Sequence, residues 1–244
     1  MKQTEIVFGI HPVIELLKAK KRKITTLYTT KPEPKAFKQI KSYFPLYPFK
    51  LVYKSRQELN SLLGTNDHQS IAVITTPLQI RKKTFEPSKQ QFIILLDGIQ
   101  DPRNLGAILR STYCTGFQGV IITQKGSAPL NAITQKAAAG LAEHLDIYLA
   151  PSAAAAVQAL KQDGYHIYIS ALEKNAQNAT TITYEKPLCL VIGSEGIGVS
   201  RDILNKGQAI ILPQRTIDIS YNASVAAGIL MFFISQQQKV LNSF

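Results

Sequence analysis

Residues 92–111 read FIILLDGIQDPRNLGAILRS, and this stretch decides the fold class. Its first five residues, Phe92–Leu96, are apolar without interruption, which is typical of a strand buried on both faces of a parallel sheet. A polar turn follows, in which Asp101 and Pro102 predict a helix start with aspartate as N-cap and proline at the first helical position. A buried strand, a turn and a helix in this order indicate one unit of an α/β sheet.

The same alternation continues to the end of the chain. After a helix predicted at 105–115, apolar runs typical of buried strands lie at 119–122, 165–169, 188–192 and 209–212. Helical patterns lie between them, around 131–143, 153–162 and 225–236. The sequence therefore predicts an α/β domain with a parallel sheet and helices on both of its faces.

The first 76 residues have a smaller pattern of their own. Helices predicted at 13–17 and 56–63 alternate with strands at 24–29 and 71–75, which indicates a compact α/β unit. The polar stretch 76–91 contains two prolines and has no clear period, as linkers do. We therefore expect a small α/β domain at 1–76, a linker at 77–90 and a larger α/β domain at 91–244.

The positive charge is concentrated near the N-terminus. The chain has 28 Lys and Arg against 16 Asp and Glu, a formal net charge of +12. Residues 1–90 hold 17 basic and 6 acidic residues, whereas residues 91–244 hold 11 and 10. A single lysine cluster is usually a solvated surface, but this segregation favours a domain that contacts a polyanion. Nucleic acid fits better than a membrane, because no broad apolar helix face lies opposite these lysines.

Composition excludes several other classes of protein. With 45% apolar residues the chain can bury a core, and no apolar run approaches the roughly 20 residues of a membrane span. The N-terminus lacks the blocks of a signal peptide. Cys114 and Cys189 form no CxxC pair, so we expect no disulfide framework, no metal site and a cytoplasmic location.

Three loops that follow predicted strands carry both glycine and polar residues. They are 97–111, 193–198 and 213–228, and ligands of an open parallel sheet bind outside the carboxyl ends of its strands. No Ser-His-Asp set, metal-ligand spacing or GxGxxG motif accompanies them, which suits a reaction driven by a reactive cosubstrate. The candidate side chains expected to surround one pocket are Asn104, Arg110, Glu195, Ser220 and Asn222.

Each loop also has a simpler explanation when it is taken alone. Asn104 and Asn222 fit local helix caps, and Arg110 fits a surface arginine whose stem packs on its helix. Three glycines in 193–198 are a weak signal, and Glu195 would repel a phosphate group, which disfavours ATP or a dinucleotide. Only the expected convergence of the three loops at one edge of the sheet makes the set informative.

The motifs DPRNLGAILRS, VIGSEGIGVS and ILP followed by SYNASVAAGI resemble the three motifs of the SpoU (TrmH) family of RNA ribose 2′-O-methyltransferases, within the SPOUT class. This resemblance covers residues 91–244. The segments VFGIHPVIELLK and HQSIAVIT resemble the family's substrate-binding domain, which is related to ribosomal protein L30e. The two-domain layout is most similar to the RlmB-like branch, which methylates a guanosine of 23S rRNA.

The resemblance implies S-adenosylmethionine as methyl donor, RNA as partner, a catalytic domain tied in a deep trefoil knot, and a homodimer with the active site near its interface. We expect no membrane and no metal as partners, because the sequence has no apolar span and no metal-ligand spacing. The family usually has Leu-Asn-Val-Ser where this chain has 221–224, an exchange that backbone contacts would survive. The implied cofactor-binding residues are Gly193, Leu212 and Tyr221, and the implied catalytic residues are Asn104, Arg110, Glu195, Ser220 and Asn222.

The implied reaction is in-line attack of a ribose 2′-hydroxyl on the methyl carbon, for which the protein aligns the oxygen and helps to remove its proton. The resemblance gives Arg110 the role of base, but a free guanidinium keeps its proton below about pH 12. Either the site lowers that pKa, or Arg110 binds a neighbouring phosphate and the proton leaves to water or Glu195. We favour phosphate binding, because the guanidinium fork fits phosphate geometry.

Two other interpretations of the sequence stay open. One is a tRNA 2′-O-methyltransferase of the same family, and the other is a non-catalytic RNA-binding or ribosome-assembly factor. A nucleotide-binding oxidoreductase is disfavoured, because the GxGxxG motif is missing.

Overall fold

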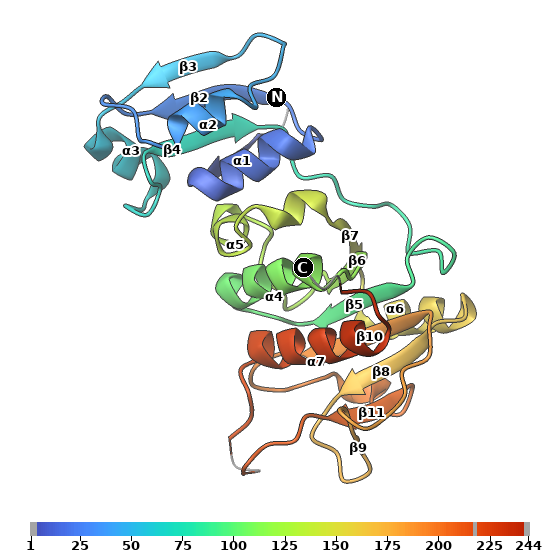
Figure 1. Ribbon diagram of the computed structural model, residues 1–244. Coiled ribbons are helices and arrows are strands. Elements are labelled where there is room, and N and C mark those ends of the chain that lie inside the picture. The colour runs from blue at the N-terminus through green and yellow to red at the C-terminus, as the bar shows by residue number, and fades with distance from the viewer. Residues whose placement is uncertain (1–3, 217–218, 242–244) are drawn as a thin grey trace. The chain divides into compact units, whose positions relative to one another are not determined.

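The computed structural model describes residues 4–216 and 219–241, which form two compact units. Unit 1 comprises Met1–Gln79 and Pro129–His144, and unit 2 comprises Ile80–Ala128 and Leu145–Phe244. Figure 1 labels the helices and strands of both units. Within the described residues, no helix is long and apolar enough to cross a membrane.

Unit 1 is built on a four-stranded mixed sheet. The strand order is β1 (Glu5–Phe8), β4 (Ile71–Thr75), β2 (Ile24–Thr29) and β3 (Lys50–Tyr53), in which only β2 and β3 pair in parallel. The helices of its first segment are α1 (Ile10–Ala19), α2 (Phe37–Lys41) and α3 (Arg56–Leu63), and segment 129–144 adds α5 (Ala132–Ala137). The apolar residues of α1 and α2 pack with those of β1, β2 and β4 in one core.

Unit 2 is built on a seven-stranded sheet in which every strand pair is parallel. The order is β7 (Asp146–Ala150), β6 (Gly119–Thr123), β5 (Phe92–Asp97), β10 (Leu188–Gly193), β8 (His166–Ser170), β11 (Gln208–Ile211) and β9 (Gln177–Asn178). A short 3-10 helix, η2 (Arg201–Ile203), precedes β11.

Helices cover both faces of this sheet, as the alternation of strands and helices predicts. α6 (Ala153–Gln162) packs against the face that includes Ile93, Leu95 and Val191. α4 (Pro102–Cys114) and α7 (Ala223–Gln237) pack against each other on the opposite face (Figure 1). The expected α/β class is confirmed for both units, whereas the trefoil knot stays a prediction.

Local sequence signals explain several element boundaries. Asp101 caps α4 by accepting a hydrogen bond from the Arg103 amide, and Pro102 is the first helical residue, as predicted. At the start of α3, Ser55 and Glu58 form a reciprocal capping box. The predicted elements at 24–29, 56–63, 71–75 and 153–162 match β2, α3, β4 and α6 residue for residue.

The helix predicted at 131–143 is wrong in extent. α5 covers only Ala132–Ala137, and a 3-10 helix, η1 (Leu141–His144), follows it. The chain turns between them because Ala139 and Gly140 take positive φ angles of 52° and 82°. The strands β1, β3, β7 and β9 were not predicted, because each is short and contains a charged or amide residue that breaks the apolar run.

Residues 129–144 pack with unit 1, although the sequence places them inside the larger domain. α5 lies against β1, and η1 lies against α1. A Cβ atom at Gly140 would approach the Cα of Pro12 in α1 to 2.6 Å. The segment between β6 and β7 therefore completes the small unit.

The stretch predicted to be a linker divides between the two units. Residues 76–79 belong to unit 1, whereas residues 80–90 belong to unit 2. Phe85 is only 1% exposed and lies in the core beside β5. Arg81 pairs with Tyr148 in an isolated parallel bridge, and its guanidinium contacts Asp146 at 3.1 Å. Residues 81–90 thus have no regular secondary structure, but they pack against unit 2 and are not a free linker.

The close approach at Gly140 gives a stability prediction. We expect Gly140→Ala to lower the free energy of unfolding by about 1–2 kcal/mol for the positive φ and about 1–3 kcal/mol for the clash with Pro12. Gly64→Ala is the matched control, because Gly64 has φ +65° and no atom within 4 Å of an added Cβ. Chemical denaturation of the two variants separates these effects, and equal losses of stability would contradict the close packing of η1 on α1.

Candidate active site

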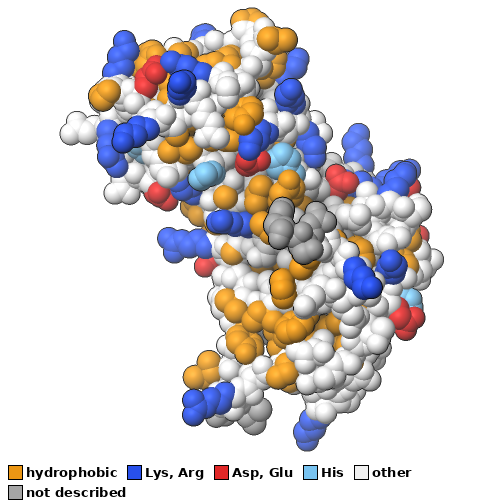
Figure 2. Space-filling view, viewed as in Figure 1, with side chains coloured by type: hydrophobic (Ala, Val, Ile, Leu, Met, Phe, Trp, Pro, Cys, Tyr) orange, Lys and Arg blue, Asp and Glu red, His pale blue; other side chains and the backbone are white. Residues whose placement is uncertain are grey.

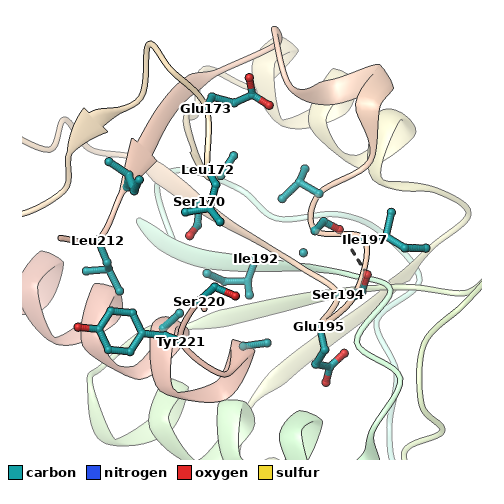
Figure 3. A pocket seen from close by; sticks show the side chains of 18 of the residues that line it. Ser170, Leu172, Glu173, Ile192, Ser194, Glu195, Ile197, Leu212, Ser220 and Tyr221 are labelled. Carbon is teal, nitrogen blue, oxygen red and sulfur yellow. Dashed lines mark hydrogen bonds between the residues drawn. The ribbon is translucent and has the colours of Figure 1, made fainter. Parts of the chain in front are cut away.

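A pocket lies at the carboxyl ends of the adjacent strands β10, β8 and β11. Its cavity volume is about 390 Å³, and its lining comes from the loops after these strands together with the start of α7. Figure 3 shows Leu212, Ser220 and Tyr221 on one side of the pocket and Ser194, Glu195 and Ile197 on the other. The volume falls within the range of ordinary small-molecule sites.

The loop after β10 is a tight turn fixed at both ends. The amide of Ser194 donates to the carbonyl of Gly198 at 3.1 Å, and the amide of Gly198 donates back to Ser194 at 3.0 Å. The amide of Ser200 donates to the Asp97 carboxylate at the end of β5, at 2.8 Å. A Cβ at Gly193 would lie 2.1 Å from the carbonyl carbon of Gly198, so only glycine fits this position.

Asn104 and Glu195 connect the first two loops. The side-chain amide of Asn104, in the first turn of α4, donates to the Glu195 carboxylate at 2.7 Å. These residues are 91 positions apart in the sequence, and they meet because β5 and β10 are parallel neighbours. Two of the three loops expected to converge therefore do so through a direct side-chain contact.

The third loop brings Leu212, Ser220 and Tyr221 to the same pocket. The Tyr221 hydroxyl donates to the Pro213 carbonyl at 3.3 Å, which holds the ring across the base of this loop. Asn222 is the N-cap of α7, and its side-chain oxygen accepts a hydrogen bond from the Ser224 amide at 2.8 Å. This oxygen therefore acts as a helix cap, which is the simpler of the two explanations given for Asn222. Residues 217 and 218 of the loop lie outside the described residues.

Arg110 does not line this pocket. It is exposed on α4, six residues after Asn104 and therefore about 9 Å further along the helix. Tyr113 follows it at i+3 on the same exposed face and is 45% exposed. Of the eight candidate residues, Gly193, Glu195, Leu212, Ser220 and Tyr221 line the cavity, Asn104 contacts it through Glu195, and Asn222 and Arg110 lie outside its lining.

A fourth loop, missed in the sequence, also lines the pocket. Ser170 ends β8 and residues 171–173 follow it, and β8 lies between β10 and β11 in the sheet. The rule that ligands bind after strand ends applies to this loop as well, but it contains no glycine and so was not selected. Glu173 contributes a second carboxylate to the pocket, and Arg201 and Gln214 add polar groups from neighbouring segments.

The lining limits the chemistry that the pocket can support. Among the described residues that line it there is no His, Cys or Lys, and the charged ones are Glu173, Glu195 and Arg201. Backbone groups of the glycine-bearing turn at 193–198 and apolar side chains such as Ile192 and Leu212 make up much of the rest. Such a pocket suits a cofactor with a flat apolar part and polar edges, held beside a substrate rather than attacked by the protein.

Comparison with known proteins identifies the family. Residues 91–232 match the model of the SpoU rRNA methylase family, and residues 6–81 match that of the RNA 2′-O ribose methyltransferase substrate-binding domain. The chain belongs to the SpoU rRNA methylase family. This membership confirms the family expected from the three motifs and the class of activity, methylation of RNA on ribose 2′-oxygens.

Similar proteins of the SpoU family extend over nearly the whole chain. Human mitochondrial rRNA methyltransferase 1 is 31% identical over 96% of this chain and 73% of its own length. The Bacillus subtilis putative TrmH family tRNA/rRNA methyltransferase YacO is 29% identical over 97% of each chain. The AdoMet-bound rRNA methyltransferase of Sinorhizobium meliloti is 21% identical, with a TM-score of 0.80 over 98% of this chain and 88% of its own. Homologous SpoU structures thus bind S-adenosylmethionine, the cofactor that the motifs predict.

The closure of the second loop on β10 can be tested by one substitution. We expect Gly193→Ala to push apart the turn at 194–198, with faster amide exchange over 193–199 and a loss of about 1–3 kcal/mol of stability. Gly196→Ala is the matched control in the same loop, because an added Cβ there meets no atom within 4 Å. Hydrogen-exchange mass spectrometry and thermal unfolding report the difference, and unchanged exchange in the Gly193 variant would contradict the tight turn.

Proposed function

We propose that this chain transfers the methyl group of S-adenosylmethionine to the ribose 2′-oxygen of a guanosine in 23S rRNA. The observation that carries the proposal is the pocket on which the motif loops converge, with Asn104 bonded to Glu195 across two of them. The two-domain layout supports the 23S rRNA branch. A tRNA target remains the alternative, because the Bacillus relative is named for both RNA classes.

The residues of the pocket fit S-adenosylmethionine, which when bound supplies an activated methyl group on a positively charged sulfur. Gly193, Leu212 and Tyr221 offer backbone groups and an apolar wall for its adenine and methionine parts. The carboxylates of Glu195 and Glu173 favour a positively charged ligand over a phosphate. Gly193 packs directly against the backbone of Gly198 and Val199, which holds the turn at 194–198 beside the pocket.

Asn104, Glu195, Ser220 and Asn222 are proposed to orient the ribose. The Asn104 contact fixes the Glu195 carboxylate at the edge of the pocket, where its second oxygen can accept the proton of the 2′-hydroxyl. Arg110 is proposed to bind the neighbouring phosphate with its guanidinium fork. This division of roles requires no deprotonated arginine.

The charge distribution of unit 1 supports contact with RNA. All five carboxylates of residues 4–79 take part in ion pairs. Figure 2 shows Lys and Arg spread over the visible face of unit 1. Exposed lysines of this unit without an ion pair among the described residues are Lys20, Lys21, Lys23, Lys31, Lys35, Lys38 and Lys50. Unpaired cations of this kind give a salt-dependent affinity for the phosphate backbone.

A homodimer is proposed on the apolar surface of α4 and α7. The first eleven residues of α7 are small or apolar on every side, and a helix of that kind is normally covered all round. Val225 and Phe232, seven positions apart on one face, are 48% and 49% exposed. Figure 2 shows apolar side chains gathered on the near face of unit 2. A second copy on this surface would cover Tyr113 and place Arg110 near the interface.

Methyl transfer is tested directly with rRNA and tRNA from a strain that lacks the gene. We expect incorporation from labelled S-adenosylmethionine into 23S rRNA, located at one guanosine 2′-oxygen by mass spectrometry. Incorporation into tRNA instead would favour the alternative target. RNA binding without methyl transfer and without calorimetric binding of S-adenosylhomocysteine would show a non-catalytic factor and overturn the proposal.

Arg110→Lys tests the phosphate-binding role. We expect kcat to fall about 10²-fold, the usual effect of removing one oriented donor at a reacting group, while S-adenosylhomocysteine still binds. Arg103→Lys is the matched control, because Arg103 is an exposed arginine two turns earlier on the same helix. Near-full methylation by the Arg110 variant, with an unchanged alkaline pH profile, would exclude both roles considered for this residue.

Phe232→Glu tests the dimer surface. We expect the variant to be monomeric in analytical ultracentrifugation and to lose methylation, because a carboxylate would be buried at the interface. Phe232→Leu keeps the apolar contact and should remain dimeric. A wild-type monomer that methylates RNA would contradict the proposed assembly.

A further inference from the structure

We propose that Arg22 is a positioning residue. Inside unit 1 it bonds to two of the chain segments that lead to unit 2, and it thereby keeps these two segments next to each other. This inference rests on the proposed function, since its consequence is the efficiency of RNA methylation. It concerns how the RNA-binding unit is tethered, not how the reacting groups are bound.

The chain passes between the two units three times. It does so after Gln79, after Ala128 and after His144, because residues 129–144 belong to unit 1. These residues connect β6 to β7, two neighbouring strands of the catalytic sheet. Unit 1 is therefore tethered through more than the polar stretch after β4.

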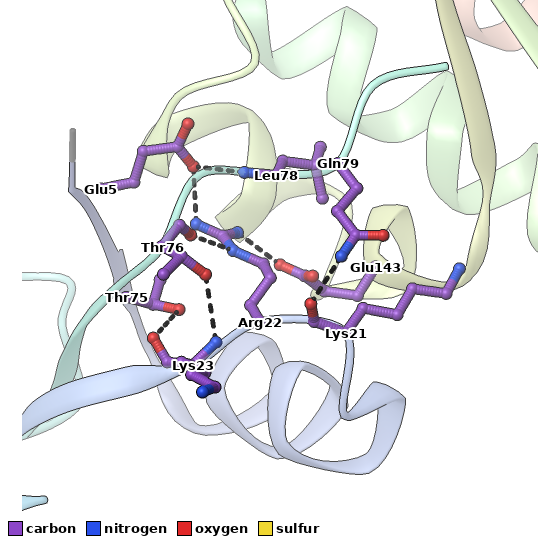
Figure 4. A network of polar contacts seen from close by, with 9 residues as sticks. All are labelled: Glu5, Lys21, Arg22, Lys23, Thr75, Thr76, Leu78, Gln79 and Glu143. Carbon is purple, nitrogen blue, oxygen red and sulfur yellow. Dashed lines mark hydrogen bonds and ion pairs between the residues drawn. The ribbon is translucent and has the colours of Figure 1, made fainter. Parts of the chain in front are cut away.

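The Arg22 guanidinium contacts both the first and the third of these passages. Its Nε donates to the carbonyl of Thr76 at 2.6 Å, three residues before the first passage. Its Nη1 donates to the carboxylate of Glu143 at 2.7 Å, one residue before the third passage. Figure 4 shows Arg22 lying between these partners.

Glu5 of β1 completes the network. Its carboxylate accepts from Nη2 of Arg22 at 2.6 Å and from the amide of Leu78 at 3.2 Å. The Gln79 side chain donates to the carbonyl of Lys21 at 2.9 Å, so residues 76–79 are held at three points beside Arg22 (Figure 4). The last residues of unit 1 before the first passage are thus fixed in place.

The ion pair between Arg22 and Glu143 is buried, unlike an ion pair on the protein surface. The Arg22 side chain is 0% exposed and that of Glu143 is 1% exposed. Burial raises the pKa of Glu143, and the adjacent Arg22 charge opposes this rise. Removing Arg22 alone would leave a carboxylate without its counter-charge in the interior, a strongly unfavourable arrangement.

The remainder of segment 129–144 is also fastened to unit 1. His144 contacts Glu15 of α1 at 2.9 Å, and Lys136 of α5 donates to the side chain of Gln69 at 2.7 Å. Gly140 packs against Pro12. Arg22 is the residue that joins this segment to residues 76–79, because it contacts Thr76 and Glu143 at once.

A role in stability alone is the weaker explanation of this pair. Buried ion pairs contribute little net stability, and apolar side chains of similar size often serve as well or better. An apolar pair would not reproduce the directed hydrogen bonds that Arg22 makes to Glu5, Thr76 and Glu143. Those bonds bring two tether points to one place, which restricts the positions that unit 1 can sample and raises the effective concentration of bound RNA at the catalytic pocket.

The test uses the full chain with the double substitution Arg22→Met and Glu143→Leu, which removes the directed bonds without leaving a buried charge. We expect an unchanged dissociation constant for S-adenosylhomocysteine, an RNA affinity within about twofold, and kcat for RNA lowered about 10- to 10²-fold, as for misplaced reacting groups. Arg56→Met is the matched control, because Arg56 is an exposed arginine of the same unit with no hydrogen bond or ion pair among the described residues. Equal kcat in the double variant and this control would overturn the proposal.

A second measurement separates this proposal from the proposed function. Spin labels at Gln158→Cys on α6 of unit 2 and at Gln57→Cys in unit 1, in a chain that also carries Cys114→Ser, report the distance distribution between the units. Cys189 is fully buried and burial raises its pKa, so it should not be labelled. We expect a narrow distribution that broadens in the double variant, and equal widths would overturn the tether even if methylation is absent. Should the double variant not fold, Arg22→Lys keeps the charge opposite Glu143 but loses the fork, and the same broadening is expected.

Discussion

The parallel pairing of β10 with β5 on one side and β8 on the other is the constraint on which the candidate site depends. Parallel strands end at the same edge of a sheet, so the loops after these three strands must meet there. The Asn104–Glu195 bond is the direct result, since each residue follows one of two paired strands. The tight turn at Gly193 then lets the second loop fold over the strand ends without a side chain in the way.

Much of this site could be predicted from local patterns. The Asp101-Pro102 helix start, the buried strand 92–96 and the glycine-bearing turn at 193–198 are signals carried by a few adjacent residues. The order of the strands in the sheet of unit 2 could not be predicted from any local pattern. Because β8 lies between β10 and β11, residues 170–173 belong to the pocket, and only the sheet topology shows this. The exposure of Arg110 on α4 is likewise a tertiary result, since the periodicity of its helix does not say which neighbours cover it.

The boundary of the small unit could not be predicted for a different reason. The sequence treats residues 1–76 as a module that could be removed, because the polar stretch after them has the composition of a linker. In the structure, Arg22 lies at 2.7 Å from Glu143, which is 121 positions away. A truncation at residue 76 would take away the counter-charge of Glu143 and the packing surface of α5 and η1. Contacts over such separations leave no periodic trace in a sequence, and the buried arginine at position 22 has the same appearance as its exposed neighbours Lys21 and Lys23.

The pocket formed by the strand-end loops and the chain segments bonded to Arg22 contribute differently to the proposed selection of one nucleotide. Attraction between lysines and phosphates gives affinity but no choice among nucleotides, because every phosphate of the RNA carries the same charge. The pocket can align one ribose, but it cannot determine which ribose arrives. In the proposed function, selection then depends on how the connections between the units restrict which nucleotides of bound RNA reach the pocket. A flexible linker would let unit 1 present many nucleotides, whereas we propose that the two chain passages held at Arg22 limit that number, so that a buried arginine of unit 1 influences a reaction carried out in unit 2.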